Sequence, residues 1–283
     1  RAILLGSRRT RIPPMRDDKV LADWNGLMIA ALTEAGMAFD ELDWISAAER
    51  AFTSVLAAQN DNARLFHSSC NGSAIELGFL DDYAAMARAA LTLHEATGNG
   101  AYFDHARNWL GELNTRYRDQ ERGGYFYTAT DGDERLLVRP RHARDAAQPS
   151  GNALASETLA RLYWLGGGDP VRAAAHSVFD AFAGDAARHP VALASLLNAY
   201  DLFASAVQIT VIGVRGEPAT DALLRAAFEL PTMNRVLRVI AASEALPVTH
   251  PAAGKKQVGG VATAYVCVGP VCTPPITTAT ELA

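Results

Sequence analysis

The sequence predicts a mainly α-helical protein in which paired helices form a ring, followed by a small α/β segment. Three observations support this. Apolar residues recur with helical periodicity from residue 20 to residue 206, and the predicted helices alternate between charge-poor and charge-rich sequences. After Ala206 the pattern changes to short β-branched runs, which indicate strands. We therefore expect two parts: a helical part at 1–206 and a C-terminal strand-helix-strand segment at 207–283.

The helical prediction depends on a repeated apolar spacing of i, i+3, i+4 and i+7, which marks one buried face of a helix. The segments with this spacing are 24–35, 44–56, 83–91, 103–113, 153–165, 171–182 and 191–203. Pro170 and Pro190 lie where two of the helices begin, in the first turn, which is a common helix-start signal.

The helices that begin near residues 24, 83, 153 and 191 are poor in charge, whereas those between them carry more. A helix that is apolar nearly all round is buried on all sides, so we expect an inner ring wrapped by an outer one. This is a repeat of helical hairpins. The connections that lead to inner helices are long, and one contains Asp131-Gly132 between two apolar runs, which predicts a β-hairpin. Before residue 207 we expect strands only there.

The C-terminal part has a different pattern. Residues 207–214 are apolar and β-branched, 219–229 are helical in pattern, and 236–241 are apolar again. A stretch rich in Gly, Pro and Lys then precedes a last predicted strand at 261–268 and a polar tail. The order strand, helix, strand indicates a small α/β unit.

The composition narrows the classes of function. The formal net charge of -5 and the pI near 5.8 give no basic face for nucleic acid. No apolar run approaches the roughly 20 residues that span a bilayer, so we expect no membrane partner. Three cysteines are too few for a secreted disulfide scaffold, which favours a cytoplasmic location. The chain opens with Arg1 and leads directly into an apolar run. We therefore interpret the sequence as part of a larger protein or a shortened form of one.

Metal and cofactor signals are weak. There is no His-x-x-x-His, no Cys-x-x-Cys, no phosphate-binding Gly-rich loop and no Gly-x-Ser-x-Gly elbow. We therefore expect neither a metal nor a cofactor. Cys267 and Cys272 are open to interpretation as a disulfide, a redox pair or small buried hydrophobic residues.

Three polar segments, at 16–27, 79–84 and 141–152, lie at or just before the starts of inner helices. If the inner helices run parallel, these segments converge on one rim, where helix N-termini favour carboxylates. Sugar sites combine carboxylates for acid/base work with aromatic rings under the sugar face. The candidate binding residues are Asp18, Lys19, Trp24, Asn25, Asp81, Tyr83, Arg141, Ser150 and Asn152.

Asp82, Asp145 and His67 are the candidate catalytic residues. We expect Asp82 and Asp145 to point into a shared pocket with Trp24 and Asn25 nearby. His67 lies in a long loop that leads to the rim. The alternative is that these acidic residues only cap helices, because Asp and Asn are favoured N-caps. Capping needs one residue of the Asp81-Asp82 pair, so the other requires a separate explanation.

Four motifs and the C-terminal end together resemble a known family. They are Arg-x-x-Pro-x-x-Asp-Asp-Lys-x-Leu-x-x-Trp-Asn-Gly-Leu at 11–27, Leu-Asp-Asp-Tyr-Ala at 80–84, Gly-Gly-Tyr-Phe at 123–126, Asp-x-Ala-x-Pro-Ser-Gly-Asn at 145–152, and Val-Cys-x-x-x-x-Cys-x-x-Pro at 266–275. In this order they resemble thioredoxin-domain-containing proteins of the spermatogenesis-associated and bacterial YyaL-like type.

The resemblance implies an incomplete α/α toroid of the six-hairpin glycosidase-like kind, similar to the barrels of N-acylglucosamine 2-epimerases and related hydrolases. It also implies a thioredoxin-like domain in the intact protein, which is absent from this chain. The expected function is a sugar hydrolase or epimerase acting by carboxylate acid/base chemistry. Epimerases of this fold use several histidines, whereas the rim offers His67 and His142. The alternative is a noncatalytic sugar-binding or regulatory module of a thioredoxin-like protein.

Overall fold

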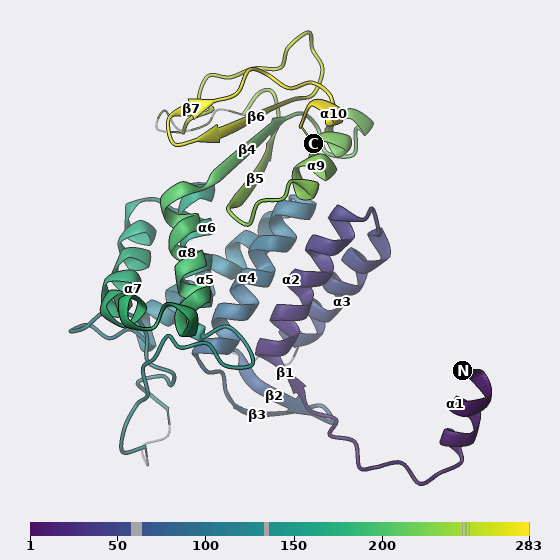
Figure 1. Ribbon diagram of the computed structural model, residues 1–283, viewed down its shortest axis with the longest axis vertical. Helices are drawn as coiled ribbons and strands as arrows, with labels where there is room; N and C mark the ends of the chain where they lie inside the picture. Colours follow the sequence, from purple (N-terminus) through teal and green to yellow (C-terminus); the bar gives the residue numbers. More distant parts are fainter. Residues whose placement is uncertain (58–63, 133–135, 245, 247, 249, 283) are drawn as a thin grey trace.

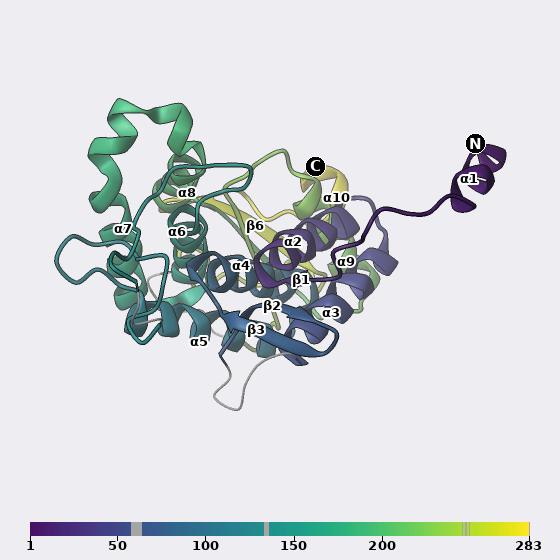
Figure 2. The same cartoon turned by 90° about the horizontal axis from the view of Figure 1, so that it is seen from below.

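The computed structural model describes residues 1–57, 64–132, 136–244, 246, 248 and 250–282. Its main body is an arc of helical hairpins (Figures 1 and 2). The inner row consists of α2 (Ala22–Ala38), α4 (Leu80–Thr97), α6 (Gly151–Leu162) and α8 (Ala194–Ser205), each in contact with the next. The outer helices are α3 (Leu42–Ala57), α5 (Gly100–Arg116) and α7 (Asp169–Arg188), each packed on the inner helix before it in the chain. The fold is therefore a mainly α, incomplete α/α toroid, as the sequence predicts.

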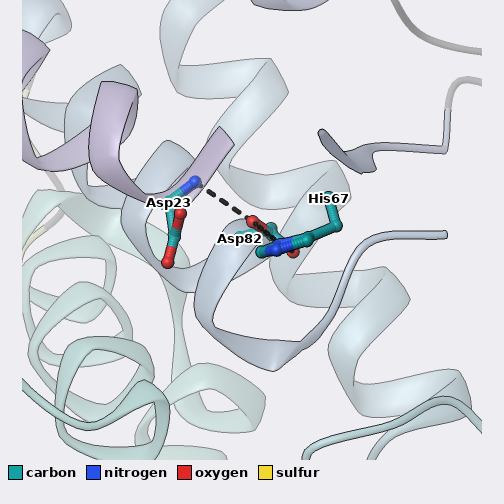
Figure 3. Close-up of side chains that lie close together, drawn as sticks. All are labelled: Asp23, His67 and Asp82. Atoms are coloured by element: carbon teal, nitrogen blue, oxygen red, sulfur yellow. Dashed lines mark hydrogen bonds and ion pairs between the residues drawn. The ribbon is translucent and has the colours of Figure 1, made fainter. Parts of the chain in front are cut away.

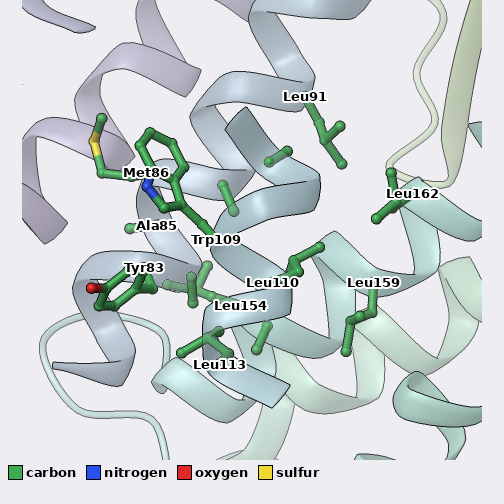
Figure 4. Close-up of a cluster of buried hydrophobic side chains, with 14 of the residues drawn as sticks. Tyr83, Ala85, Met86, Leu91, Trp109, Leu110, Leu113, Leu154, Leu159 and Leu162 are labelled. Atoms are coloured by element: carbon green, nitrogen blue, oxygen red, sulfur yellow. The ribbon is translucent and has the colours of Figure 1, made fainter. Parts of the chain in front are cut away.

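The Ala-rich sequence of α4 explains its central place in the arc. Small residues let α2 and α6 approach α4 closely from both sides, and nearly the whole of α4 is buried. Larger side chains such as Met86, Trp109 and Leu154 fill the space between the helices (Figure 4). Gly98 ends α4 at a positive φ of 75°, a conformation that glycine adopts without strain.

Among the described residues no further hairpin covers either end of the inner row, and both ends expose apolar side chains. Met28 on α2 is 59% exposed, and Tyr200 on α8 is 51% exposed. The short N-terminal helix α1 (Ala2–Arg9) lies away from the body, and residues 10–19 that follow it are exposed (Figure 1). Between α6 and α7 the chain makes a single π-helical turn, η1 (Tyr163–Gly167), and a 3-10 turn, η2 (Pro190–Leu193), precedes α8.

The predicted hairpin around Asp131 is wrong for the residues that the structure describes there. Residues 123–132 and 136–138 form no strand, and only an isolated bridge joins Arg118 to Tyr125; residues 133–135 lie outside the described part. The hairpin is instead formed by β2 (Phe66–Cys70) and β3 (Ser73–Leu77), with β1 (Val20–Leu21) paired to β2. The intervening Asn71 and Gly72 adopt φ values of 50° and 78°, as a two-residue hairpin turn requires.

The C-terminal part forms the expected strand-helix-strand unit. β4 (Val207–Ile212), α9 (Pro218–Glu229) and β5 (Arg235–Ile240) follow in order, and β4 pairs parallel with β5. β6 (Thr263–Val268) and β7 (Val271–Cys272) extend the sheet on the other side of β4, and α10 (Ala279–Leu282) follows. Cys267 and Cys272 are directly paired across β6 and β7 and joined by a disulfide.

Charged side chains connect the helical arc to this sheet. Glu95 on α4 accepts a hydrogen bond from the Leu237 N–H of β5 at 2.8 Å. Arg161 on α6 donates to the carbonyl oxygen of Arg235, also at 2.8 Å, and pairs with Glu157 at 3.0 Å. The sheet is therefore attached at the C-terminal ends of the inner helices.

Within the described residues, none of the helices combines the length and the apolar character that crossing a membrane requires.

Replacing Gly26 with alanine should reduce stability by on the order of 2 kcal/mol, because the new Cβ would overpack the contact between α2 and α4. A Cβ built there would lie 2.6 Å from the Ala85 carbonyl carbon and 2.8 Å from the Met86 nitrogen, and both are rigid backbone atoms. The measurement is the free energy of unfolding from chemical denaturation.

Gly111→Ala is the matched control. It also lies within a helix, but a Cβ there would meet no atom within 4 Å. It should stabilise the protein by about 0.5–1 kcal/mol through helix propensity alone. Equal effects of the two changes would contradict the close packing of α2 on α4.

Candidate functional site

The three polar segments predicted to converge do so at the end of the arc where α2, α4 and α6 begin. The Asp23 N–H donates to Asp82 Oδ1 at 3.0 Å, which joins the starts of α2 and α4. Gln148, just before α6, donates from Nε2 to Asp23 Oδ2 at 3.1 Å. The strands β1 to β3 lie at the same end (Figure 1). We call this region the rim, and its central cluster consists of Asp23, His67 and Asp82 (Figure 3).

Asp82 is the most enclosed member of the cluster, with no exposed surface. It occupies the third position of α4, and its Oδ2 accepts from the Phe79 N–H at 2.7 Å, as in a capping box. Its other oxygen accepts from Asp23, and the His67 ring lies 3.1–3.2 Å from both. Burial raises the pKa of Asp82, while the bond to His67 opposes that rise.

His67 on β2 is the member that reaches the surface, with 24% of its side chain exposed. Its Nδ1 is held by Asp82, whereas Nε2 makes no hydrogen bond within the described residues. The hydrogen bond to Asp82 raises the pKa of His67, although burial opposes it. The arrangement fixes the ring and leaves one nitrogen able to exchange a proton with a ligand.

Aromatic rings form a half-buried wall beside this histidine. The Phe79 ring lies 4.9 Å from the His67 ring, centroid to centroid, and Tyr127 stacks on Phe79 at 4.7 Å with 16° between the planes. The rim therefore places flat apolar surface directly beside a titratable side chain.

Asp81 lies beside the cluster, against the first turn of α6. Burial raises its pKa to about 6, and the neighbouring carboxylates of Asp82 and Asp23 add to the rise. Contacts with Gln148 and with the Gly151 N–H partly oppose it. A Cβ at Gly151 would lie 2.0 Å from Asp81 Oδ1, so only glycine leaves room for this carboxyl. At neutral pH, Asp81 therefore retains a protonated fraction that an ordinary aspartate lacks.

The cluster also has the composition of a cation site, because ligand atoms of Asp23, His67 and Asp82 lie within 4.8 Å of one another. Both Asp82 oxygens, however, already accept backbone N–H groups, and both contact His67. A metal would have to displace His67 from Asp82. The donor set fits a hydrogen-bonded His–Asp pair better than a metal centre.

Asp145 makes its hydrogen bonds to residues other than Asp82 and His67. Its Oδ1 accepts from the Ser150 N–H at 3.1 Å and its Oδ2 from the Ser195 N–H at 2.9 Å. It thereby ties the start of α6 to the start of α8. No hydrogen bond in the described part of the chain joins Asp145 to Asp82, and their shared pocket stays a prediction.

Several candidate binding residues serve the fold instead. Tyr83 is fully buried, and its hydroxyl accepts from the Leu65 N–H at 3.2 Å, so its ring cannot form a ligand platform. Asn152 is also fully buried and bonds to the backbone of Tyr125. Ser150 caps α6, and Arg141 pairs with Asp119 at 3.3 Å. Helix-start spacing indicates where these residues lie along the chain but not the direction in which their side chains point.

The remaining candidates are near the surface. Asp18 and Lys19 lie in the exposed stretch before β1, and their ion pairs are with the neighbouring Arg16 and Asp17. Trp24, which follows Asp23 in the chain, is 63% exposed. Asn25 is half-buried and donates to the Leu21 carbonyl at 2.7 Å.

Four residues of the site were not among the candidates. Asp23 and Gln148 lie within the motifs at 11–27 and 145–152, so the sequence does contain a signal for them. Phe79 and Tyr127 lie beside motif residues, and only the fold shows that their rings stack on each other next to His67.

Comparison with known proteins confirms the resemblance inferred from the motifs. No protein-family model matches the chain. Human spermatogenesis-associated protein 20 is 28% identical over 296 residues, which cover 99% of this chain and 37% of that protein. An uncharacterised protein of Caenorhabditis elegans is 27% identical over 99% of this chain and 39% of its own length. The chain thus spans well under half the length of these relatives.

Solved structures support the same fold. A GH76 alpha-mannanase from Bacteroides thetaiotaomicron superposes with a TM-score of 0.52 at 12% identity, covering 78% of this chain and 58% of that one. The cellobiose 2-epimerase of Spirochaeta thermophila superposes with a TM-score of 0.50 at 19% identity, covering 60% and 44%. At these identities the likeness shows the six-hairpin glycosidase-like fold alone.

Asp81→Asn should stabilise the protein increasingly as the pH rises from 4 to 8. The pKa of Asp81 is about 6 in the folded state against an ordinary 3.8, so the ionised form is disfavoured on folding. The contribution of Asp81 to the free energy of unfolding is therefore complete below pH 3.8. It falls by on the order of 2–3 kcal/mol as the pH rises past 6. The measurement is the difference in unfolding free energy between variant and parent at each pH.

The exposed Asp104→Asn on α5 is the control for a general change of charge. If the difference in unfolding free energy between Asp81→Asn and the parent does not change between pH 4 and pH 8, the raised pKa of Asp81 is contradicted.

Proposed function

We propose that this chain binds a carbohydrate at the rim and exchanges protons with it through His67 and Asp81. The observation that carries the proposal is the 3.1 Å contact between His67 and Asp82, beside a second carboxyl with a pKa of about 6. General acid/base catalysis is most efficient when the groups titrate near the working pH. The mannanase and the epimerase that share the fold act on sugars, which supports the choice of ligand class.

Each group has a distinct role in the proposed mechanism. His67 Nε2 accepts a proton from the attacking water, and protonated Asp81 gives one to the leaving sugar oxygen. Asp82 holds His67 through Nδ1 and stabilises its charged form. Because both Asp82 oxygens already carry hydrogen bonds, we assign Asp82, predicted to be catalytic, to positioning. Asp145 receives a similar role at the starts of α6 and α8.

Hydrolysis is favoured over epimerisation because, among the described residues, His67 is the one histidine that the rim holds through a side-chain hydrogen bond. The His142 side chain is exposed, and the part of this residue that bonds to Asn152 is its backbone carbonyl. Phe79 and Tyr127 provide the flat surface for the sugar, with exposed Trp24 as a further candidate. A carboxylate and histidine mechanism therefore fits the available side chains.

A second function is favoured by the hydrogen bonding of Asp82 and Asp23. Every oxygen of these two carboxylates accepts a backbone N–H or the Gln148 amide. A rim organised in this way suits a noncatalytic sugar-binding or regulatory module. A thioredoxin-like domain in the intact protein and a cytoplasmic location remain predictions from the resemblance and the cysteine count.

His67→Asn should lower kcat/KM for a cleaved oligosaccharide at least about 100-fold, while the melting temperature changes little, because His67 is partly exposed. The assay incubates the purified chain with neutral oligosaccharides and follows new reducing ends by NMR. His176→Asn, an exposed histidine on α7, is the matched control and should retain activity.

Asp82→Asn tests positioning through the pH profile. The bond to Asp82 raises the pKa of His67, so its loss should move the His67 limb of the rate profile to lower pH. Binding without turnover in the parent chain would favour the noncatalytic module. Turnover unaffected by His67→Asn would overturn the proposed mechanism.

A further inference from the structure

The disulfide between Cys267 and Cys272 lies on the C-terminal sheet, at the opposite end of the inner helices from the rim (Figure 1). It joins two residues that are directly paired between the antiparallel strands β6 and β7. β7 is the edge strand of this sheet, next to β6 and then β4. The proposed chemistry of the rim makes no use of this pair.

The hairpin that carries the disulfide is also held by its backbone. Val268 pairs with Val271, and the Thr273 N–H donates to the Val266 carbonyl oxygen at 2.9 Å. The two cysteines are 5 residues apart in the chain. A crosslink over so short a loop removes less conformational freedom from the unfolded chain than one over a long loop. We therefore expect the hairpin to keep its form when the disulfide is reduced.

The two sulfur atoms differ in their access to solvent. Cys267 has no exposed surface, whereas Cys272 on the edge strand is half-buried. Thiol–disulfide exchange begins when a thiolate attacks one sulfur and the other sulfur leaves, so access decides which one is attacked. Cys272 is therefore the sulfur that an incoming thiolate reaches, and Cys267 is the leaving group. The Pro251 carbonyl oxygen, 3.4 Å from Cys272 Sγ, is placed to accept a hydrogen bond from the thiol that reduction produces.

A buried amide lies beside the leaving sulfur. Gln208 on β4 is directly opposite Cys267 on β6, so the two side chains lie on the same face of the sheet. Gln208 is 3% exposed, and its Nε2 has no hydrogen-bond partner in the part of the chain that the structure describes. Cys267 otherwise packs among apolar and aromatic side chains, where a thiolate is disfavoured unless a donor faces it. A thiolate at Cys267 would give the Gln208 N–H the acceptor that it lacks.

We propose that Cys267 and Cys272 form a reversible thiol–disulfide exchange site whose reactant is a dithiol. A thiolate of the dithiol attacks Cys272 Sγ, the bond between the two cysteines breaks, and its electron pair stays on Cys267 Sγ beside the Gln208 N–H. The second thiol of the reactant then attacks the mixed disulfide, closes the reactant's own disulfide and releases Cys272. Two electrons pass to the chain, and the two protons of the dithiol end on Cys267 and Cys272. This site does not depend on what the rim binds.

The test follows reduction of the folded chain by dithiothreitol, with thiols counted by alkylation and mass spectrometry. Cys70→Ser is made throughout, so that no third cysteine remains. We expect complete reduction without denaturant, reoxidation by oxidised dithiothreitol, and little change in melting temperature. Gln208→Met keeps the length of the side chain but removes the N–H, and should slow reduction about tenfold. Thr210→Val, on the same face of β4 but opposite Tyr265, is the matched control and should leave the rate unchanged.

Two single-cysteine variants test which sulfur is attacked. In Cys267→Ser, the remaining Cys272 should form a mixed disulfide with oxidised glutathione at least about tenfold faster than Cys267 does in Cys272→Ser, because Cys267 is enclosed. A disulfide that resists dithiothreitol until the chain is denatured overturns the proposal. So does a rate that Gln208→Met changes no more than Thr210→Val, or faster reaction of Cys267. Melting curves check that each variant is folded, and the single-cysteine comparison decides the outcome if Gln208→Met is not.

Discussion

One buried carboxylate, that of Asp82, organises the end of the arc where the candidate site lies. It receives backbone N–H groups from the starts of α2 and α4 and contacts the His67 ring on β2. An ion removed from water is strongly unfavourable unless hydrogen bonds replace its hydration, and these donors do so. The same contacts therefore hold the helices together and orient the histidine, so packing and proposed chemistry cannot be changed independently at this position.

The two ends of the inner helices carry different electrostatics. At the rim, burial raises the pKa of Asp82 and brings the pKa of Asp81 to about 6. Farther along the inner helices, Arg88 and Arg161 keep Glu157 ionised, and Glu95 and Arg161 connect α4 and α6 to β5. Near neutral pH, Asp81 thus keeps a protonated fraction, whereas Glu157 is ionised.

The order and pairing of the helices could be predicted because burial determines periodicity, and the Ala-rich inner helices differ visibly from their partners. The helix-start motif at 79–84 predicts Asp82 at the rim, and the long loop that leads to the rim suggests His67 there. The direction of side chains did not: Tyr83 and Asn152 share those motifs yet point into the core, where they bond to backbone groups. The hairpin lies elsewhere than predicted because the sequence contains a second Xaa-Gly pair that suits such a turn, Asn71-Gly72, and the fold uses that one.

The open arc has a consequence for how the protein loses its structure. Apart from contacts with the C-terminal sheet unit, each hairpin packs on its neighbours in the arc, so we expect cooperativity along the arc to be local, as in other repeat proteins. α4 is covered on both sides, whereas α8 exposes Tyr200 at a free end. Amide hydrogens in α7 and α8 should therefore exchange through partial opening, while those of α4 exchange only on global unfolding. The terminal hairpin then sets the lifetime of the native state under proteolysis, independently of the stability of the centre.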